Sequence, residues 1–367
     1  MKISTRKDSL LQAVLLSERI TGKKESLPIL SCILIDAQHE VVVRATNLEA
    51  GIEVRIPADV EEVGKIAVMA NILSQTVRSI SGDTISLKSN EDGNLVIESR
   101  GTKTVIKAIP HEEFPTLSLE ESPSKGSLVP RERFLRGIQA VIYAASPSMI
   151  RPELGSVYVS IKQGAITCVA TDSFRLAEKT IPGASKEDTG DLLIPLKHAL
   201  ELTHILDRIP AENIEIRIEE SDLDIRADGA RFVSRVVDAT FPNYKEIIPK
   251  NFTTEATLLT GDFAEMLRKA RIFSGNDQHV GLHIYPHRKI FSATARTNDV
   301  GEMSDSIDAA ISGEDLDINF HIGYLADCLS SIESDSITLG FGGIGRPVVI
   351  KGVSDATFTY LVMPLNR

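Results

Sequence analysis

The chain contains the same pattern three times, and this repetition constrains its fold more than any other feature. An apolar block begins at Val68, returns at Ile194 and returns again at Phe320, so both steps are 126 residues (194 − 68 and 320 − 194). Further along each copy, one more apolar residue keeps the same register: Ile80, Leu206 and Ile332. Because the block has helical periodicity, one type of amphipathic helix recurs in each of three similar units.

A second helical pattern recurs less regularly, with steps of 124 and 129 residues, at Leu10–Val14, Phe134–Ile138 and Phe263–Leu267. Between the two helices of each unit, short segments rich in β-branched residues alternate with a period of two, which is typical of strands. Ala45, Ala170 and Ala295 lie in these segments, 125 residues apart. Each unit therefore has the order strand, helix, strands, helix, strands. This order predicts an α+β fold in which an antiparallel sheet covers one side of a helix pair.

Polar linkers rich in Pro, Gly and Ser separate the units, notably at 118–126 and 249–251. We therefore predict three tandem domains at 1–122, 127–248 and 254–367. Such a chain has two unlike ends and repeated lateral faces, so head-to-tail association of copies is able to close into a ring. The repeats alone do not require closure.

The composition is that of a globular protein, with 42% hydrophobic and 25% charged residues. No apolar run approaches the roughly 18 residues that a bilayer span needs, so we expect no membrane association. The apolar run after the N-terminal basic residues is interrupted by polar ones and predicts an amphipathic helix, not a signal peptide. Cys32, Cys168 and Cys328 are too scattered for a disulfide framework or a zinc site, which favours a reducing cytoplasm.

Motifs for catalysis are missing from the sequence. It contains no phosphate-binding GxxxxGK loop, no GxGxxG turn, no HExxH pair and no GxSxG elbow. His279, His283 and His287 have a spacing that would line one face of a helix, but Gly281 and Pro286 contradict a helix there. Alternating residues instead favour a strand with solvated histidines over a metal site. We therefore expect a non-catalytic protein without metal or cofactor; a metal-dependent hydrolase using His279 and His283 is the enzymatic alternative.

Charge is distributed unevenly along the chain. The whole chain carries −11, whereas the six helical segments at 8–24, 70–80, 131–142, 195–208, 261–272 and 322–332 together carry +4, so the remainder carries −15. The positive side is supplied by Lys23, Lys24, Arg131, Arg133, Arg136, Lys197, Arg268, Lys269 and Arg271. A basic helix layer suits nucleic acid, but the signal is weak alone, because basic residues on helix surfaces are usually solvated.

Four motifs, taken in order, point to a family: Leu27–Leu30 (LPIL), Ala170–Ala177 (ATDSFRLA), Phe241–Tyr244 (FPNY) and Leu361–Leu365 (LVMPL). Together with the triple repeat, they resemble the bacterial DNA polymerase III beta subunit, the sliding clamp, over essentially the whole chain. The resemblance implies a DNA clamp fold: a head-to-tail homodimeric ring of six domains, with twelve helices lining the hole and antiparallel sheets outside. Duplex DNA would pass through the hole, held by topology and not by base-specific contacts.

The resemblance also implies partners and site residues. The partners are double-stranded DNA, a second copy of the chain, the clamp loader, the replicative polymerase alpha subunit, and other polymerases or repair proteins that carry a clamp-binding peptide. DNA-contacting positions of the family correspond to Lys24, Lys197 and, less securely, Arg151. Subunit-interface positions correspond to Ile272 and Phe273, for which an apolar helix end in the core is the alternative. The pocket for partner peptides corresponds to Leu154, Thr171, Phe174, Arg175, Leu176, Pro242, Ile247, Pro347, Val362, Met363, Pro364 and Leu365.

Three positions depart from the family pattern. Phe174 stands where the family often has His, Asn366 stands where it often has Arg, and Glu246 stands where some relatives have a basic residue. The peptide preference of the family therefore does not carry over to this chain. A second function consistent with the acidic surface is a repeat scaffold that binds only proteins.

Overall fold

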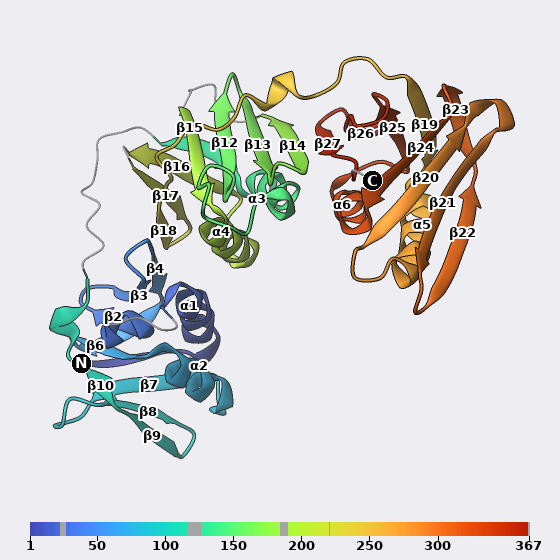
Figure 1. Ribbon diagram of the computed structural model, residues 1–367. Helices are drawn as coiled ribbons and strands as arrows, with labels where there is room; N and C mark the ends of the chain where they lie inside the picture. The colour runs from blue at the N-terminus through green and yellow to red at the C-terminus, as the bar shows by residue number, and fades with distance from the viewer. Residues whose placement is uncertain (23–26, 116–125, 184–189, 220, 366–367) are drawn as a thin grey trace. The chain divides into compact units, whose positions relative to one another are not determined.

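The computed structural model describes residues 1–22, 27–115, 126–183, 190–219 and 221–365. Within them each repeat folds in one order: a strand, a helix, four or five strands, a second helix, and three or four strands (Figure 1). The predicted order of elements is therefore confirmed in all three repeats.

The elements of the first repeat are β1 (Lys2–Arg6), α1 (Lys7–Ile20), β2 (Cys32–Ala37), β3 (Val41–Thr46), β4 (Ala50–Ile56), β5 (Ala58–Glu62), β6 (Gly64–Met69), α2 (Ala70–Ser79), β7 (Thr84–Ser89), β8 (Leu95–Ser99), β9 (Thr102–Ile106) and β10 (Ala108–Ile109). Those of the second are β11 (Ser127–Pro130), α3 (Arg131–Gln139), β12 (Ser156–Lys162), β13 (Ala165–Thr171), β14 (Arg175–Pro182), β15 (Gly190–Pro195), α4 (Leu196–Arg208), β16 (Asn213–Glu219), β17 (Asp222–Ala227) and β18 (Ala230–Arg235). Those of the third are β19 (Thr254–Leu259), α5 (Thr260–Phe273), β20 (His279–Tyr285), β21 (Ile290–Thr297), β22 (Gly301–Ile307), β23 (Ala309–Gly313), β24 (Leu316–His321), α6 (Ile322–Asp327), β25 (Ser336–Phe341), β26 (Val348–Gly352) and β27 (Phe358–Val362).

Antiparallel pairing joins the strands into four sheets across the described residues. The first repeat contributes a five-stranded sheet in the order β5-β1-β7-β8-β9, and the third contributes a four-stranded sheet in the order β22-β21-β20-β24. Two nine-stranded sheets cross the repeat boundaries, in the orders β10-β6-β2-β3-β4-β18-β17-β16-β11 and β15-β12-β13-β14-β27-β26-β25-β19-β23. The second repeat therefore shares one sheet with each of its neighbours.

This sharing explains why the chain divides into two compact units and not three. One unit comprises Met1–Glu132 with Leu200–Val236, and the other comprises Arg133–Ala199 with Val237–Arg367. The last strands of the second repeat, together with β11, belong with the first repeat, through β4 and β18, whereas β12 to β15 belong with the third, through β14 and β27. The sequence repeats and the compact units are different divisions of the chain, so the boundaries at 1–122, 127–248 and 254–367 stay a prediction.

Each helix buries an apolar stripe of side chains. In α1 the buried positions include Leu10, Ala13 and Leu16, which are three residues apart and so lie on one helical face. The third copy of the second helix is shorter than its sequence period predicts, because α6 ends at Asp327 and continues as a 3-10 turn at Cys328–Ser331. Among the described residues, no helix combines the length and the apolar character that a membrane crossing requires.

Candidate functional site

An apolar surface lies on the nine-stranded sheet of the second unit, on the face away from its helices. Successive side chains of a strand point to opposite faces. On β13, Cys168 faces the helices, because a Cβ added to Gly137 of α3 would lie 3.0 Å from its sulfur. Val169 therefore points to the other face, where it forms a buried cluster with Leu176 and Leu361. A sheet face turned away from the helices is usually polar, so this apolar cluster marks a place where something else packs.

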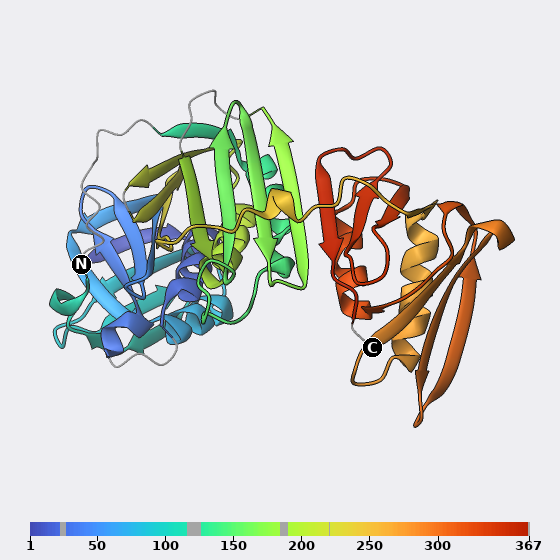
Figure 2. The same cartoon turned by 45° about the horizontal axis from the view of Figure 1, so that its top comes forward.

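The chain that connects the second and third repeats covers part of this cluster. Figure 2 shows residues 237–253 crossing the strands on this face. Tyr244 is buried in the cluster, and the Phe241 ring stacks on Tyr158 with 5.1 Å between ring centroids. Burial raises the pKa of Tyr244, and a hydrogen bond to Glu178 adds to this effect. The Tyr244 phenol is therefore neutral at physiological pH.

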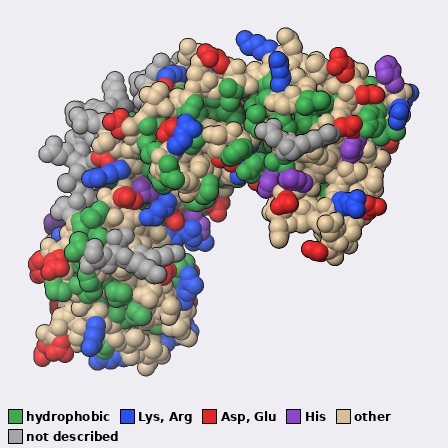
Figure 3. All heavy atoms as spheres, in the orientation of Figure 1, with side chains coloured by type: hydrophobic (Ala, Val, Ile, Leu, Met, Phe, Trp, Pro, Cys, Tyr) green, Lys and Arg blue, Asp and Glu red, His purple; other side chains and the backbone are tan. Residues whose placement is uncertain are grey.

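Apolar side chains at the edge of this surface remain open to solvent. Phe174 is 61% exposed, Ile247 is 56% exposed and Met363 is 37% exposed. Hydrophobic side chains also reach the surface over these strands in Figure 3. Leu176 and Leu361 of the cluster are buried. Leu154 and Val362 are buried too, but Val362 follows Leu361 on β27 and so points to the opposite face of the sheet. The arrangement gives a buried floor and an exposed rim of apolar side chains, which suits the docking of an apolar peptide side chain.

A tight turn at 171–175 presents Phe174 to solvent. The Asp172 carboxylate accepts hydrogen bonds from the backbone N–H groups of Phe174 (2.9 Å) and Arg175 (3.0 Å), and the Thr171 hydroxyl donates to the Arg175 carbonyl at 2.6 Å. Ser173 takes a left-handed conformation with φ of 79°, which the Asp172 contacts hold in place. The Phe174 carbonyl accepts from the Met363 N–H at 2.8 Å, so this turn and the C-terminal strand position each other.

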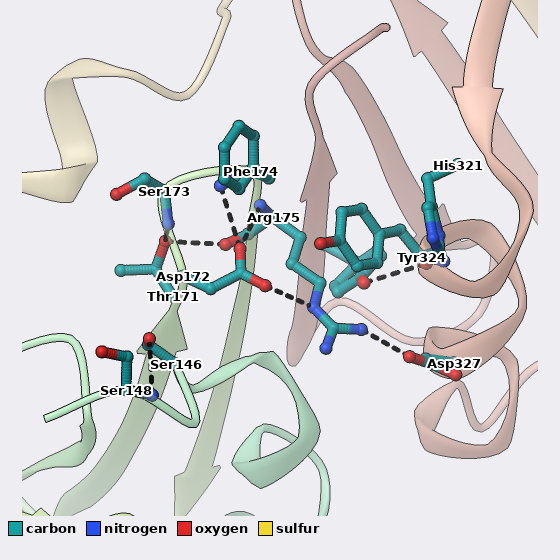
Figure 4. Close-up of polar contacts among 11 residues, drawn as sticks. Ser146, Ser148, Thr171, Asp172, Ser173, Phe174, Arg175, His321, Tyr324 and Asp327 are labelled. Carbon is teal, nitrogen blue, oxygen red and sulfur yellow. Dashed lines mark hydrogen bonds and ion pairs between the residues drawn. The ribbon is translucent and has the colours of Figure 1, made fainter. Parts of the chain in front are cut away.

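Arg175 leaves the turn in a different direction from Phe174 (Figure 4). Its guanidinium ion-pairs with Asp172 and Asp327 and lies 4.4 Å from the centre of the Tyr324 ring. Only 12% of the Arg175 side chain is exposed. The structure therefore places Arg175 in the junction between the second and third repeats, beside the predicted pocket and not on its open rim.

The structure brings most of the predicted pocket residues into one region of the second unit. Thr171, Phe174, Arg175 and Leu176 follow one another through the turn into β14, which pairs with β27 so that Arg175 lies opposite Val362. Pro242 and Ile247 lie on the connecting chain, where both are exposed, while Pro347, Pro364 and Leu365 are half-buried near the strand ends. Further residues of the apolar cluster were not predicted from the sequence, namely Tyr158, Val169, Phe241, Tyr244, Ile248, Phe252, Val349 and Leu361. The FPNY motif contained two of them, but only the fold shows that they pack on this sheet.

Two of the three predicted DNA-contacting residues lie near the start of α4. The Leu196 N–H donates to the Gly155 carbonyl at 2.9 Å, and the Gly155 N–H donates to the Arg151 carbonyl at 3.0 Å. This chain of bonds ties the Arg151 turn to the first turn of α4, where the Lys197 side chain is exposed. Glu153 pairs with Arg151 at 2.9 Å and offsets part of its charge. Lys24 lies outside the described residues.

The two predicted interface residues end α5. Ile272 is 65% exposed, so the alternative that it belongs to the core is wrong. Phe273 is partly buried and lies close to the start of β22, where its ring is 3.9 Å from the position that a Cβ on Gly301 would take. An exposed aliphatic side chain beside a sheet edge suits an interface with another chain.

The histidines do not form a metal centre in the described residues. His279 and His283 lie on β20, so the strand prediction is confirmed. One ring nitrogen of His283 contacts Asp317 at 2.5 Å and the other contacts the Thr294 hydroxyl at 2.8 Å, so both nitrogens have partners. No group of three or more His, Cys, Asp or Glu side chains in the described part of the chain is arranged to hold a metal ion.

Comparison with known proteins gives matches along the whole chain. Three family models match in order: the N-terminal domain of the DNA polymerase III beta subunit at 1–118, the central domain at 128–243 and the C-terminal domain at 245–366. A beta sliding clamp of Streptococcus pneumoniae (strain ATCC BAA-255 / R6) is 27% identical over 375 residues, which cover 99% of this chain and 98% of the relative.

Solved structures also match this chain over its whole length. The crystal structure of the DNA polymerase III beta subunit of Thermotoga maritima has a TM-score of 0.94 at 25% identity and covers 100% of this chain and 99% of its own. The crystal structure of a DNA polymerase sliding clamp of Bacillus subtilis has a TM-score of 0.93 at 26% identity, with the same coverage.

Proposed function

Because the chain belongs to the DNA polymerase III beta subunit family, we propose that two copies close head to tail around duplex DNA and tether the replicative polymerase to it. The chain is a non-catalytic sliding clamp that confers processivity. Its ring, its lining and its partner pocket each depend on particular residues of this chain.

One observation supports the ring. The same junction between two strands occurs twice within the chain, and one further strand of each type is left unpaired at a sheet edge. In each junction, the third strand after the first helix of one repeat pairs with the third strand after the second helix of the next repeat. These pairs are β4 with β18 and β14 with β27. In the described part of the chain, the equivalent strands β22 and β9 are edge strands of their sheets. A second copy supplies the missing partner of each, and two such junctions close a dimer.

Sequence-independent contact with DNA suits the charge of the helices. Duplex DNA carries one negative charge per roughly 1.7 Å, so a modestly basic lining attracts it without reading bases. We assign the lining to the helix layer, with Lys197, Arg151 and Lys24 as phosphate contacts. The surplus of acid elsewhere in the chain repels DNA from other surfaces. Retention then depends on the closed ring and not on tight phosphate binding.

Partner proteins dock on the apolar site of the second unit. A short peptide with Leu or Phe anchors fits the exposed rim of Phe174, Ile247 and Met363 over the buried floor, and Met adapts its shape to different anchors. The polymerase alpha subunit, other polymerases, repair proteins and the clamp loader would share this site. We place the protein in the cytoplasm, where these partners act on DNA.

The oligomeric state tests this function against a repeat scaffold that binds only proteins. Sedimentation should give the mass of two 40.0 kDa chains at micromolar concentration, and negative-stain images should show a six-lobed annulus. A monomer at that concentration would refute the ring. Replacing Lys24 and Lys197 with Glu should shorten retention on circular DNA, whereas unchanged retention would favour the scaffold.

A further inference from the structure

Asp317, His283 and Thr294 form a chain of hydrogen bonds on the four-stranded sheet of the third repeat. On β20, Val280, Leu282 and Ile284 are buried, and the half-buried His283 alternates with them. Successive side chains of a strand point to opposite faces, so His283 lies on the face turned away from the core. Neither the proposed ring nor the partner pocket uses these side chains.

Strand pairing brings polar residues from three strands together on this face. Gly281 of β20 lies opposite Thr294 of β21 and Asn319 of β24. His283, two residues further along β20, lies opposite Asp317 of β24. Directly opposed residues of antiparallel strands share a face of the sheet, so Thr294, Asn319 and Asp317 are all neighbours of His283.

The hydrogen bonds fix which ring nitrogen of His283 carries the proton. Its Nδ1 lies 2.5 Å from Oδ1 of Asp317, and a carboxylate only accepts, so the Nδ1–H is the donor. The Nε2 of the neutral ring is then an acceptor. The Thr294 hydroxyl, 2.8 Å away, therefore donates its hydrogen bond to Nε2. The Tyr285 hydroxyl donates to the same Asp317 oxygen at 2.7 Å and holds the carboxylate in place.

A carboxylate, an imidazole and a hydroxyl in this order are the parts that turn a hydroxyl into a nucleophile. The distance between the Thr294 hydroxyl and His283 Nε2 is within the range for proton transfer to a general base. The Asp317 carboxylate selects the tautomer of the imidazole and stabilises its charged form. Thr294 is therefore chemically distinct from an ordinary surface hydroxyl.

The missing side chain of Gly281 leaves space beside the Thr294 oxygen. The nearest neighbours of a Cβ built on Gly281 would be Oγ1 of Thr294 at 3.0 Å, Oδ1 of Asn319 at 3.1 Å and Nε2 of His283 at 3.4 Å. Polar atoms from three strands thus converge on a point that Gly281 leaves open. A carboxamide carries a donor as well as an acceptor, so Asn319 can donate to an oxygen that gains negative charge there.

We propose that Thr294 is a site of covalent self-modification, at which its Oγ1 accepts a small acyl group from an activated ester. A bond forms between Oγ1 and the carbonyl carbon, and the bond between that carbon and the leaving-group oxygen breaks. His283 Nε2 takes the hydroxyl proton and passes it to the leaving group. Nothing is oxidised or reduced. The product is one acyl ester per chain, so the reaction is stoichiometric and the clamp remains non-catalytic.

The surroundings of Thr294 favour a small donor with a good leaving group. Ser304 lies opposite Thr294 on β22, and Ser292 lies two residues before it on the same face. These polar side chains offer little apolar area to hold a long acyl chain. We therefore expect acyl groups the size of acetyl.

Reaction of the full-length protein with p-nitrophenyl acetate tests the assignment. Samples are quenched with acid at successive times, and the acetylated residues are identified by mass spectrometry of peptides. We expect an acetyl ester on Thr294 that neutral hydroxylamine removes. The reagent also acetylates lysines, but those amides resist hydroxylamine, so the two products are distinguished.

Variants separate activation from mere exposure. His283→Asn removes the base and should slow ester formation at Thr294 roughly a hundredfold. Asp317→Asn no longer selects the tautomer and should slow it roughly tenfold. Thr294→Ser keeps a hydroxyl and should keep the reaction, whereas Thr294→Val should abolish it. Ser292→Ala removes a hydroxyl directly opposite His283 and is the matched control, which should leave the rate unchanged.

Three results would overturn the proposal, provided that circular dichroism shows each variant to be folded. The first is the absence of an ester on Thr294 of the parent protein at every time. The second is an equal rate of ester formation in the parent and in His283→Asn. The third is an ester spread equally over Thr294, Ser292 and Ser304, because exposure alone would then explain the reaction.

Discussion

At the residue scale, neighbouring side chains of the 171–175 turn have separate tasks. Phe174 offers its ring to solvent, whereas Arg175 connects Asp172 in the turn to Asp327 in the third repeat. Asp172 is 11% exposed and Asp327 is 43% exposed, so the two ion pairs differ in solvent screening. The turn that presents the rim of the pocket is therefore held by the repeat junction.

Removing the Arg175 guanidinium should destabilise the second unit. Arg175→Met leaves the Asp172 carboxylate without its buried partner, and we expect a loss of about 3 kcal/mol. Asp327→Asn removes only the more exposed partner, for which we expect about 1 kcal/mol or less. Urea unfolding followed by circular dichroism measures both shifts. Equal shifts in the two variants would contradict the screening difference.

Truncating Phe174 should separate binding from stability. Because its side chain is mostly exposed, Phe174→Ala should change the free energy of unfolding by no more than about 0.5 kcal/mol. Its loss from the rim should weaken a peptide with Leu and Phe anchors roughly tenfold, measured by fluorescence anisotropy. Leu128→Ala removes a similarly exposed side chain from a strand of the other unit and is the control. Equal peptide affinity in both variants would place the pocket elsewhere.

At the element scale, the β14–β27 junction carries a buried ion pair between Lys179 and Asp355, with 3.2 Å between Nζ and Oδ2. Burial alone would raise the pKa of Asp355. Hydrogen bonds from Thr357, from the Glu333 N–H and from Lys179 outweigh this effect, and the pKa lies below its ordinary value. The ionised carboxylate is therefore stabilised by the folded junction.

The lowered pKa sets the pH range in which Asp355 stabilises the fold. Its contribution is present above the ordinary aspartate pKa of about 3.9 and is lost as the pH falls through the folded-state value. At neutral pH, Asp355→Asn should cost about 3 kcal/mol, because Lys179 loses its buried partner and keeps only the exposed Glu333, 4.0 Å away. The difference between parent and variant should shrink as the pH falls below about 4. Unfolding curves between pH 3 and 7, with Asp335→Asn as an exposed control, measure it; a constant difference would contradict the assignment.

Much of the order of helices and strands could be predicted from the sequence, because the repeat at Val68, Ile194 and Phe320 is a local periodic signal. Element order and the strand containing His283 followed from periodicity alone. The sheets that cross repeat boundaries did not, since nothing local to β4 or β18 specifies their pairing. The direction of Arg175 and the packing of Tyr244 on Val169 also depend on residues far away in sequence. Motif resemblance supplied the predicted pocket residues, but only the fold shows which of them are buried and which are exposed.

At the scale of the whole molecule, we infer that the closed ring, and not strong adhesion, keeps the protein on DNA. The chain as a whole is acidic, and its helix segments are only modestly basic. Such a surface gives weak, salt-sensitive contact with phosphate. Long residence on DNA therefore requires a topological barrier.

Retention on circular and linear DNA tests this claim most directly. The protein is loaded onto a closed circular plasmid by a clamp loader and moved into moderate salt, and the circle is then cut once with a restriction enzyme. Encirclement predicts that the protein stays on the intact circle and leaves within moments of the cut by sliding off the ends. Equal retention on cut and uncut DNA, or equally fast loss from both, would contradict encirclement.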